Sequence, residues 1–170
     1  NRLLPHLHLP KSDGTMIEID LVMIARTGIY VFESKNFSGC IFGDEDSRYW
    51  TQTMKRGPKQ QFYNPIWQNE SRISSLKRQL ALEADAFKSY VVFSDQCTLK
   101  KMYVRSGRVK VMNRSMIVRE IIKDMAELPD IFTPLEINQI YSELVPYTHT
   151  AAAIGQARIE TVRLEGRNEC

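Results

Sequence analysis

The sequence predicts an α/β domain whose mixed central sheet, an antiparallel meander plus a crossover strand, is flanked by helices. Residues 3–54 contain short runs of β-branched and aromatic residues separated by turn residues, which is typical of antiparallel strands. Apolar residues then recur with helical spacing over residues 65–82. An almost continuously apolar run at 89–94 follows that helix, as expected of a strand that is covered on both faces after a crossover.

The composition is that of an ordinary globular protein. Of the 170 residues, 43% are hydrophobic and 25% are charged, and the formal net charge is +3. These values exclude collagen-like, low-complexity and strongly disordered chains. No apolar run approaches the roughly 20 residues that span a bilayer, and residues 1–10 lack the apolar segment of a signal peptide. We expect one domain over residues 1–147 and a tail or linker over residues 148–170.

The cysteines indicate a cytoplasmic protein. Cys40, Cys97 and Cys170 are odd in number and widely spaced, so neither a disulfide framework nor a C-x-x-C metal site is present in this stretch. A reducing compartment fits this usage best, and we interpret Cys40 and Cys97 as small core residues.

The meander is expected in the first third of the chain. Residues 3–9 form a first strand that stops at Pro10, and residues 16–24 and 29–36 form a hairpin in which Gly28 is available for a positive φ. A short piece at 40–42 leads to an edge strand at 49–54, which is the fourth strand of the meander.

The helices are expected in the second part. Asn64-Pro65 begins the helix over 65–82, and the strand at 89–94 follows it. Residues 102–105 and 108–112 form two short strands, and residues 117–125 form a helix. Thr133-Pro134-Leu135-Glu136 is a capping box that begins a helix ending near Pro146.

Acidic residues of the hairpin form the candidate chemical site. If the hairpin closes with Ala25 opposite Gly28, Asp20 lies across from Glu33 and Glu18 lies across from Lys35, whereas a three-residue loop would spoil this register. The two carboxylates would then stand about 5 Å apart at Cβ, which costs stability unless a proton or cation lies between them. Carboxylate oxygens are the ligands that Mg²⁺ or Mn²⁺ prefers. The alternative is a solvated strand face with a Glu18–Lys35 ion pair.

The same residues carry a resemblance to a known family. Asp20 followed by Glu33-Ser34-Lys35 resembles the D…(D/E)-x-K motif of restriction-endonuclease-like nucleases. Together with neighbouring motifs, the chain resembles the nuclease-related domain (NERD) family over residues 1–145 as an order of elements. These further motifs are Glu18-Ile19-Asp20, the segment 28–36, Ser38-Gly39, the isolated Trp50 and Asn64-Pro65-x-x-Gln68.

The resemblance implies a restriction-endonuclease-like core and a metal-dependent nuclease, acting on DNA rather than RNA. Asp20 and Glu33 would hold Mg²⁺, or alternatively Mn²⁺, and the main-chain carbonyl of Ser34 would complete the inner shell. Lys35 would position the attacking water or steady charge on the phosphate, and Gln68 is the fourth catalytic candidate. A binding module of the same fold that has lost turnover, and recruits nucleic acid for an attached domain, is the alternative.

Two features at the ends of the chain bear on this choice. Similar nucleases carry an acidic residue on a helix before the first strand, whereas this sequence opens inside that strand at Asn1, as a fragment would. Similar proteins can continue into a zinc ribbon, so Cys170 is either its first ligand or a free thiol. His6 and His8 share one strand face but lack partners at metal-ligand spacing.

Basic residues predict contacts with a nucleic-acid backbone. The stretch between Asp95 and Glu120 contains seven cations and no acid, and Gln68 and Arg72 lie on a polar stripe of the helix about 115° from its apolar stripe. The alternatives are an edge hairpin whose lysines prevent aggregation, and a solvent-facing helix side. The predicted nucleic-acid-binding residues are Lys55, Arg56, Lys59, Arg72, Lys100, Lys101 and Arg105.

Overall fold

The computed structural model describes residues 1–148, which form nine β-strands and three α-helices. The strands are β1 (Arg2–Pro10), β2 (Met16–Ala25), β3 (Gly28–Lys35), β4 (Gly39–Asp44), β5 (Tyr49–Thr53), β6 (Gln60–Tyr63), β7 (Phe87–Phe93), β8 (Cys97–Tyr103) and β9 (Val109–Asn113). The helices are α1 (Pro65–Leu80), α2 (Ile117–Glu127) and α3 (Pro134–Leu144), with short 3-10 helices at Ala84–Ala86 and Arg114–Met116. Most of the predicted tail, from residue 149 onward, lies outside the described residues.

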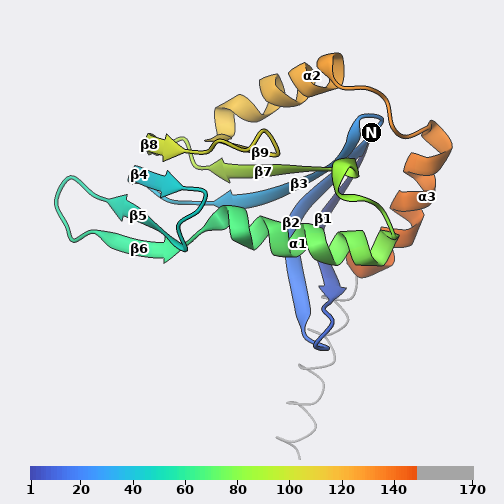
Figure 1. Cartoon of the computed structure of the whole chain (residues 1–170), viewed down its shortest axis with the longest axis horizontal. Helices are drawn as coiled ribbons and strands as arrows, with labels where there is room; N and C mark the ends of the chain where they lie inside the picture. Colours follow the sequence, from blue (N-terminus) through green and yellow to red (C-terminus); the bar gives the residue numbers. More distant parts are fainter. Residues whose placement is uncertain (149–170) are drawn as a thin grey trace, which may run out of the picture.

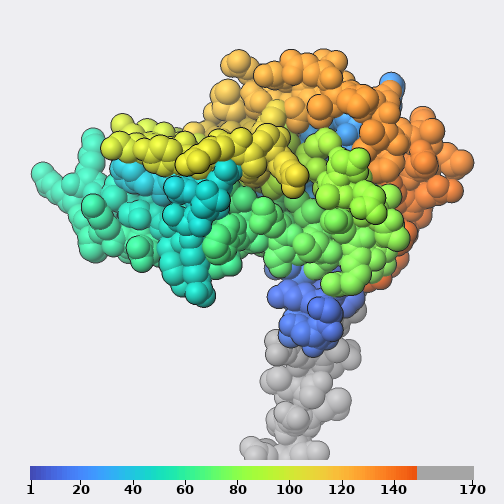
Figure 2. Space-filling model, viewed as in Figure 1, coloured from blue at the N-terminus to red at the C-terminus, as the bar shows by residue number. Residues whose placement is uncertain are grey.

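The strands form two mixed sheets that lie side by side (Figure 1). The main sheet has the order β1-β2-β3-β7-β9, with β1 to β3 antiparallel and β7 and β9 parallel to β3. The small sheet has the order β6-β5-β4-β8, in which only β4 and β8 are parallel. Figure 2 shows the small sheet projecting to one side of the body formed by the main sheet and the helices. No helix among residues 1–148 has the length and apolar character needed to cross a membrane.

Each face of the main sheet has its own core. On one face Ile29 and Val31 of β3 pack with Leu76 of α1, and α3 closes the same cluster through Leu144. On the other face aromatic residues of β3 and β7, among them Tyr90, pack against α2. A third cluster joins the small sheet to β7 and β9. Glu33 and Lys35 have the parity of Ile29 and Val31, so they belong to the α1 face.

The predicted hairpin and crossover are confirmed. Ala25 pairs with Gly28 and the antiparallel ladder continues to Leu21 and Phe32, which is the predicted register. Gly28 has φ of 145°, and a Cβ there would lie 2.9 Å from the carbonyl oxygen of Ala86, so glycine is required. After α1, β7 runs parallel to β3, as the buried apolar run predicted.

The predicted helices also form. Asn64 caps α1 by accepting a hydrogen bond from the main-chain N–H of Ile66, and Pro65 stands at the first helical position. Thr133 and Glu136 form the reciprocal capping box of α3. The observed helices begin where these caps predict, because the cap satisfies N–H groups that have no partner inside the helix.

The four-stranded meander is wrong, because β4 and β5 leave the main sheet. The edge of β3 that β4 would use is taken by β7, and β4 pairs with β5 and β8 instead. The chain turns away at Gly39, whose φ is 81° and whose Cβ would lie 2.4 Å from the carbonyl oxygen of Thr53. Trp50 of β5 then stacks on Phe93 of β7 and joins the two sheets.

The strand pair at 102–105 and 108–112 is not a hairpin. The first strand is longer than predicted, Cys97–Tyr103, and forms an edge of the small sheet beside β4. The second, Val109–Asn113, pairs with β7 in the main sheet. The strand β6 (Gln60–Tyr63) was not predicted, because its polar sequence lacks the alternation that marks a strand.

Candidate active site

Asp20 and Glu33 meet where β2 and β3 separate. The backbone ladder ends at Leu21 and Phe32, and beyond it the Asp20 side chain takes over the pairing: its Oδ2 accepts a hydrogen bond of 2.9 Å from the main-chain N–H of Ser34. The predicted hairpin register therefore places Asp20 beside the Glu33-Ser34 backbone. One main-chain group of Ser34 is committed to Asp20, which orients this carboxylate.

Glu33 is a buried carboxylate held by two cations. Its side chain is 2% exposed, which excludes the solvated strand face that the sequence left open. The Lys35 ammonium lies 2.6 Å from Oε1, and the Arg72 guanidinium donates to Oε2. A buried carboxylate needs such partners because leaving it unpaired costs several kcal/mol.

Arg72 of α1 reaches both acids of the site. Besides Glu33, its Nη2 lies 3.8 Å from Oδ1 of Asp20, and its Nε donates a hydrogen bond of 2.7 Å to the main-chain carbonyl of Glu18. The side chain is 15% exposed. The predicted polar stripe of α1 therefore does not face solvent at Arg72, whose guanidinium is turned toward the two carboxylates.

Burial shifts the pKa of both cations in the same direction. Burial lowers the pKa of the Lys35 ammonium, and the Asp20 carboxylate only partly opposes this. Burial likewise lowers the pKa of Arg72, against the effect of Asp20 and Glu18. A lysine with a lowered pKa loses its proton more readily and can exchange one with water.

The Glu18–Lys35 ion pair of the alternative interpretation does not form, and Glu18 does not lie across from Lys35. β2 pairs with β3 only from Leu21 to Ala25, so Glu18, nearer the start of β2, faces β1 instead. Its carboxylate lies 3.2 Å from Nδ1 of His6 and 3.9 Å from Nε2 of His8. Lys35 turns to Glu33 on its own strand. The two histidines therefore pair with an exposed acid at the rim of the site.

Gln68 and Asn69 lie on the first turns of α1. Among residues 1–148 the buried Oε1 of Gln68 has no hydrogen-bond partner, and Gln68 precedes Arg72 by one helical turn. Asn69 was not predicted: it is fully buried, and its Nδ2 donates to the Val31 carbonyl and to Ser89, which fixes α1 on β3 and β7. Asparagine inside a helix is unfavourable unless its side chain makes compensating contacts. Its presence in the predicted helix was therefore the sequence signal for a buried polar contact at Asn69.

The donor atoms at this site suit a hard divalent cation. Asp20 and Glu33 offer carboxylate oxygens, and the buried amide oxygen of Gln68, one helical turn before Arg72, receives no hydrogen bond from the part of the chain that the structure describes. An all-oxygen set is the chemistry that Mg²⁺ prefers. Within residues 1–148, no group of three or more His, Cys, Asp or Glu side chains is placed to hold a metal ion, so a site here depends on two carboxylates with neutral oxygens beside them.

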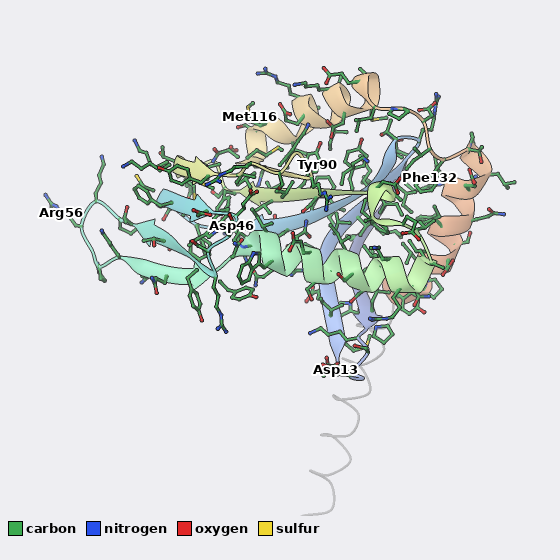
Figure 3. All side chains as sticks on the ribbon, viewed as in Figure 1. Asp13, Asp46, Arg56, Tyr90, Met116 and Phe132 are labelled. Carbon is green, nitrogen blue, oxygen red and sulfur yellow. The ribbon has the colours of Figure 1, made fainter. Side chains whose placement is uncertain are left out.

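The remaining predicted cations lie on the small sheet and its loops. Lys55, Arg56 and Lys59 are exposed on the loop between β5 and β6, and Figure 3 shows Arg56 at its tip, directed away from the main sheet. The second group follows the opposite edge of that sheet, on and just after β8. Its members, all exposed, are Lys100, Lys101 and Arg105. The structure therefore separates these two groups from Arg72.

The acid-free stretch is not a uniform cationic surface. Lys110 of β9 contacts Glu120 at 3.1 Å and Asp124 at 2.5 Å, both on α2. Its charge is therefore neutralised on the face of the main sheet opposite Glu33. Two acids of α2, which follow the basic stretch in the sequence, therefore cancel the charge of Lys110 within that stretch.

Comparison with known proteins adds a family. A family model described as "Nuclease-related domain" matches residues 1–94. The chain is 34% identical over 99 residues to an uncharacterized protein from Bacillus anthracis, a match that covers 58% of this chain and 46% of the relative. The chain thus spans about half the length of that relative. No solved structure matches. The family match contains Asp20, Glu33, Lys35 and Gln68, and it ends at β7.

Proposed function

The chain belongs to the nuclease-related domain family, and from this membership we propose that it is a metal-dependent nuclease that hydrolyses phosphodiester bonds, of DNA in preference to RNA. The observation that carries the proposal is the buried Glu33 carboxylate with Lys35 at 2.6 Å and Asp20 beside the next peptide. This arrangement has the residue types and the proximity that D…E-x-K chemistry needs.

The residues of this chain would divide the work as follows. Asp20, Glu33, the Ser34 carbonyl and the Gln68 amide oxygen would hold Mg²⁺ or Mn²⁺, which supplies Lewis-acid polarisation of a phosphate oxygen. Lys35, as an ammonium group held by Glu33, would orient the attacking water and stabilise negative charge on the phosphate as the new P–O bond forms and the ester P–O bond breaks. Asp20 keeps its orientation through the N–H of Ser34.

Nucleic-acid binding is assigned to exposed cations outside the acid pair. Such residues attract phosphates without reading sequence, and their contribution weakens as salt concentration rises. We expect the loop between β5 and β6, and the edge at β8, to contact the backbone on either side of the small sheet. The residues concerned are Lys55, Arg56, Lys59, Lys100, Lys101 and Arg105.

One observation favours a second candidate function. Lys35 and Arg72 already compensate the charges of Asp20 and Glu33, so the acid pair is stable without a further cation. A nucleic-acid-binding module of the same fold, without turnover, would retain this arrangement as a structural ion-pair network.

Cleavage of labelled DNA and RNA, single- and double-stranded, tests the proposal. We expect cleavage with Mg²⁺ or Mn²⁺ and none with EDTA, and we expect Glu33→Ala and Lys35→Ala to abolish it. Glu127→Ala and Lys123→Ala, which change the same charges at exposed positions of α2, serve as controls and should retain activity. Cleavage that survives both site substitutions would refute the assignment, and binding without metal-dependent cleavage would establish the module.

A further inference from the structure

Arg72 lies where a divalent cation would have to bind. Its guanidinium contacts Oε2 of Glu33 with one nitrogen and stands 3.8 Å from Oδ1 of Asp20 with another. These are the two carboxylates that the proposed function assigns to metal binding. A single side chain therefore spans the acid pair, in the way expected of a planar fork that matches carboxylate oxygens.

The charges of the site are balanced as they stand. Asp20 and Glu33 contribute two negative charges, and Lys35 and Arg72 contribute two positive charges. A divalent cation added to this set would leave two excess positive charges among side chains that are 2% to 34% exposed. Like charges at such distances repel strongly because partial burial weakens screening. Binding of the cation therefore favours withdrawal of Arg72 from the carboxylates.

The side chain also has an anchor outside the acid pair. Nε of Arg72 donates to the main-chain carbonyl of Glu18 at 2.7 Å, an acceptor that is not part of the acid pair. Arg72 also sits on α1, which Asn69 fixes to β3 and β7 through two buried hydrogen bonds. The guanidinium can thus release the acids while remaining at the rim of the site.

We propose that Arg72 is an internal counter-ion of the site, which holds Asp20 and Glu33 together and competes with the divalent cation for them. The proposal rests on the proposed function, because it takes these carboxylates as metal ligands. The proposal gives Arg72 a regulatory role. The affinity for the divalent cation is low in the free protein, and it rises when a substrate phosphate provides another partner for the released guanidinium. Because such coupling is reciprocal, metal and nucleic acid each raise the affinity for the other.

Calorimetric titration with Mn²⁺, in the absence of nucleic acid, tests this competition. Arg72→Met keeps the length and apolar stem of the side chain but removes its charge, and we expect Mn²⁺ to bind it about tenfold more tightly than wild type, which corresponds to about 1.4 kcal/mol. Arg78→Met is the matched control, because it removes the same charge from the same helix where the guanidinium contacts the Pro10 carbonyl. Its Mn²⁺ affinity should equal that of wild type.

The outcomes separate the two proposals. If wild type binds Mn²⁺ and Arg72→Met binds it no more tightly, the counter-ion role is overturned while the metal site stands. If Glu33→Gln fails to bind and Arg72→Met binds more tightly, both stand. Absence of Mn²⁺ binding to every variant overturns both. Equal tightening in Arg72→Met and Arg78→Met shows a general charge effect and overturns the specific role.

Wild-type protein provides a second measurement that does not depend on the folding of Arg72→Met. The ¹⁵Nη resonances of Arg72, identified by their loss in Arg72→Lys, should shift as Mg²⁺ is added, because the Nη atoms contact the two carboxylates. The midpoint should equal that of Mg²⁺ binding measured by calorimetry. Resonances that stay unmoved at saturating Mg²⁺ would overturn the proposal, because the guanidinium would then keep its partners.

Discussion

Tyr90→Phe is expected to lower the free energy of unfolding by about 2 to 3 kcal/mol, through one hydrogen bond on the α2 face. Tyr90 is 1% exposed, and its hydroxyl donates to Oδ2 of Asp124 at 2.5 Å (Figure 3 shows Tyr90 between the main sheet and α2). Burial and the Asp124 carboxylate raise the pKa of Tyr90, so the hydroxyl remains a donor. A hydrogen bond to a charged group contributes about 1.5 to 3 kcal/mol, and Asp124, itself 8% exposed, would lose one of its two donors.

Tyr30→Phe is the matched comparison. Tyr30 is fully buried on the neighbouring strand of the same face, but its hydroxyl pairs with a neutral group, Oγ1 of Thr27, at 2.7 Å. A neutral hydrogen bond contributes about 1 kcal/mol. Urea unfolding monitored by circular dichroism should therefore show Tyr90→Phe to be about twice as costly. Equal losses, or a loss below about 1 kcal/mol for Tyr90→Phe, would refute the charge-assisted bond. Folded Tyr90→Phe should bind metal as wild type does, because Glu33 lies on the opposite face.

Three further predictions concern a helix cap, pH and salt. Asn64→Ala should lower the free energy of unfolding by about 3 kcal/mol in urea, because the buried side chain caps α1 and donates to three loop carbonyls; a loss below about 1 kcal/mol would contradict this. Hydrogen bonds from Thr133 hold the pKa of Glu136 below its ordinary value of 4.5. As the pH falls, Glu136 therefore takes up a proton in the unfolded state at a higher pH than in the folded state. The free energy of unfolding then decreases as the pH drops below 4.5. Glu136→Gln should flatten this decline in melting temperature, and an unchanged slope would count against the capping interaction. Glutamine at three cations of the loop between β5 and β6 should reduce the slope of log K against log salt for DNA binding by up to about 3; an unaltered slope would show that the loop does not contact phosphate. The three residues are Lys55, Arg56 and Lys59.

The hairpin and its acid pair illustrate what local sequence can predict. Strand alternation and the turn at Ala25–Gly28 are enough to place Asp20 next to Glu33, because a ladder register follows from the turn that begins it. The same reasoning failed for Glu18 and Lys35, since it assumed that the ladder continues. β2 and β3 are not paired on the N-terminal side of Leu21, and there the Asp20 side chain accepts the hydrogen bond from the main-chain N–H of Ser34.

Arg72 shows why part of the site could not be predicted. Its place on α1 follows from helical periodicity, but its partners lie on β2 and β3, more than thirty residues away. A helical wheel gives the direction of a side chain relative to its own helix. It does not indicate which residues of other elements lie in contact with that side chain. Likewise, Lys110 belongs to the basic stretch in sequence yet is neutralised by α2.

Local sequence patterns were sufficient to predict the hairpin, the parallel crossover, the capped helices and the closeness of Asp20 and Glu33. The hairpin and the helix caps depend on hydrogen bonds and periodicities within one strand pair or one helical turn, and the crossover follows from a buried apolar run that comes after a helix. The departure of β4 into a second sheet beside β8, and the contact of Arg72 with both carboxylates, became visible only in the folded molecule. Those outcomes depend on competition between distant segments for one strand edge or one buried charge. A local sequence pattern does not indicate which of the competing segments forms the contact.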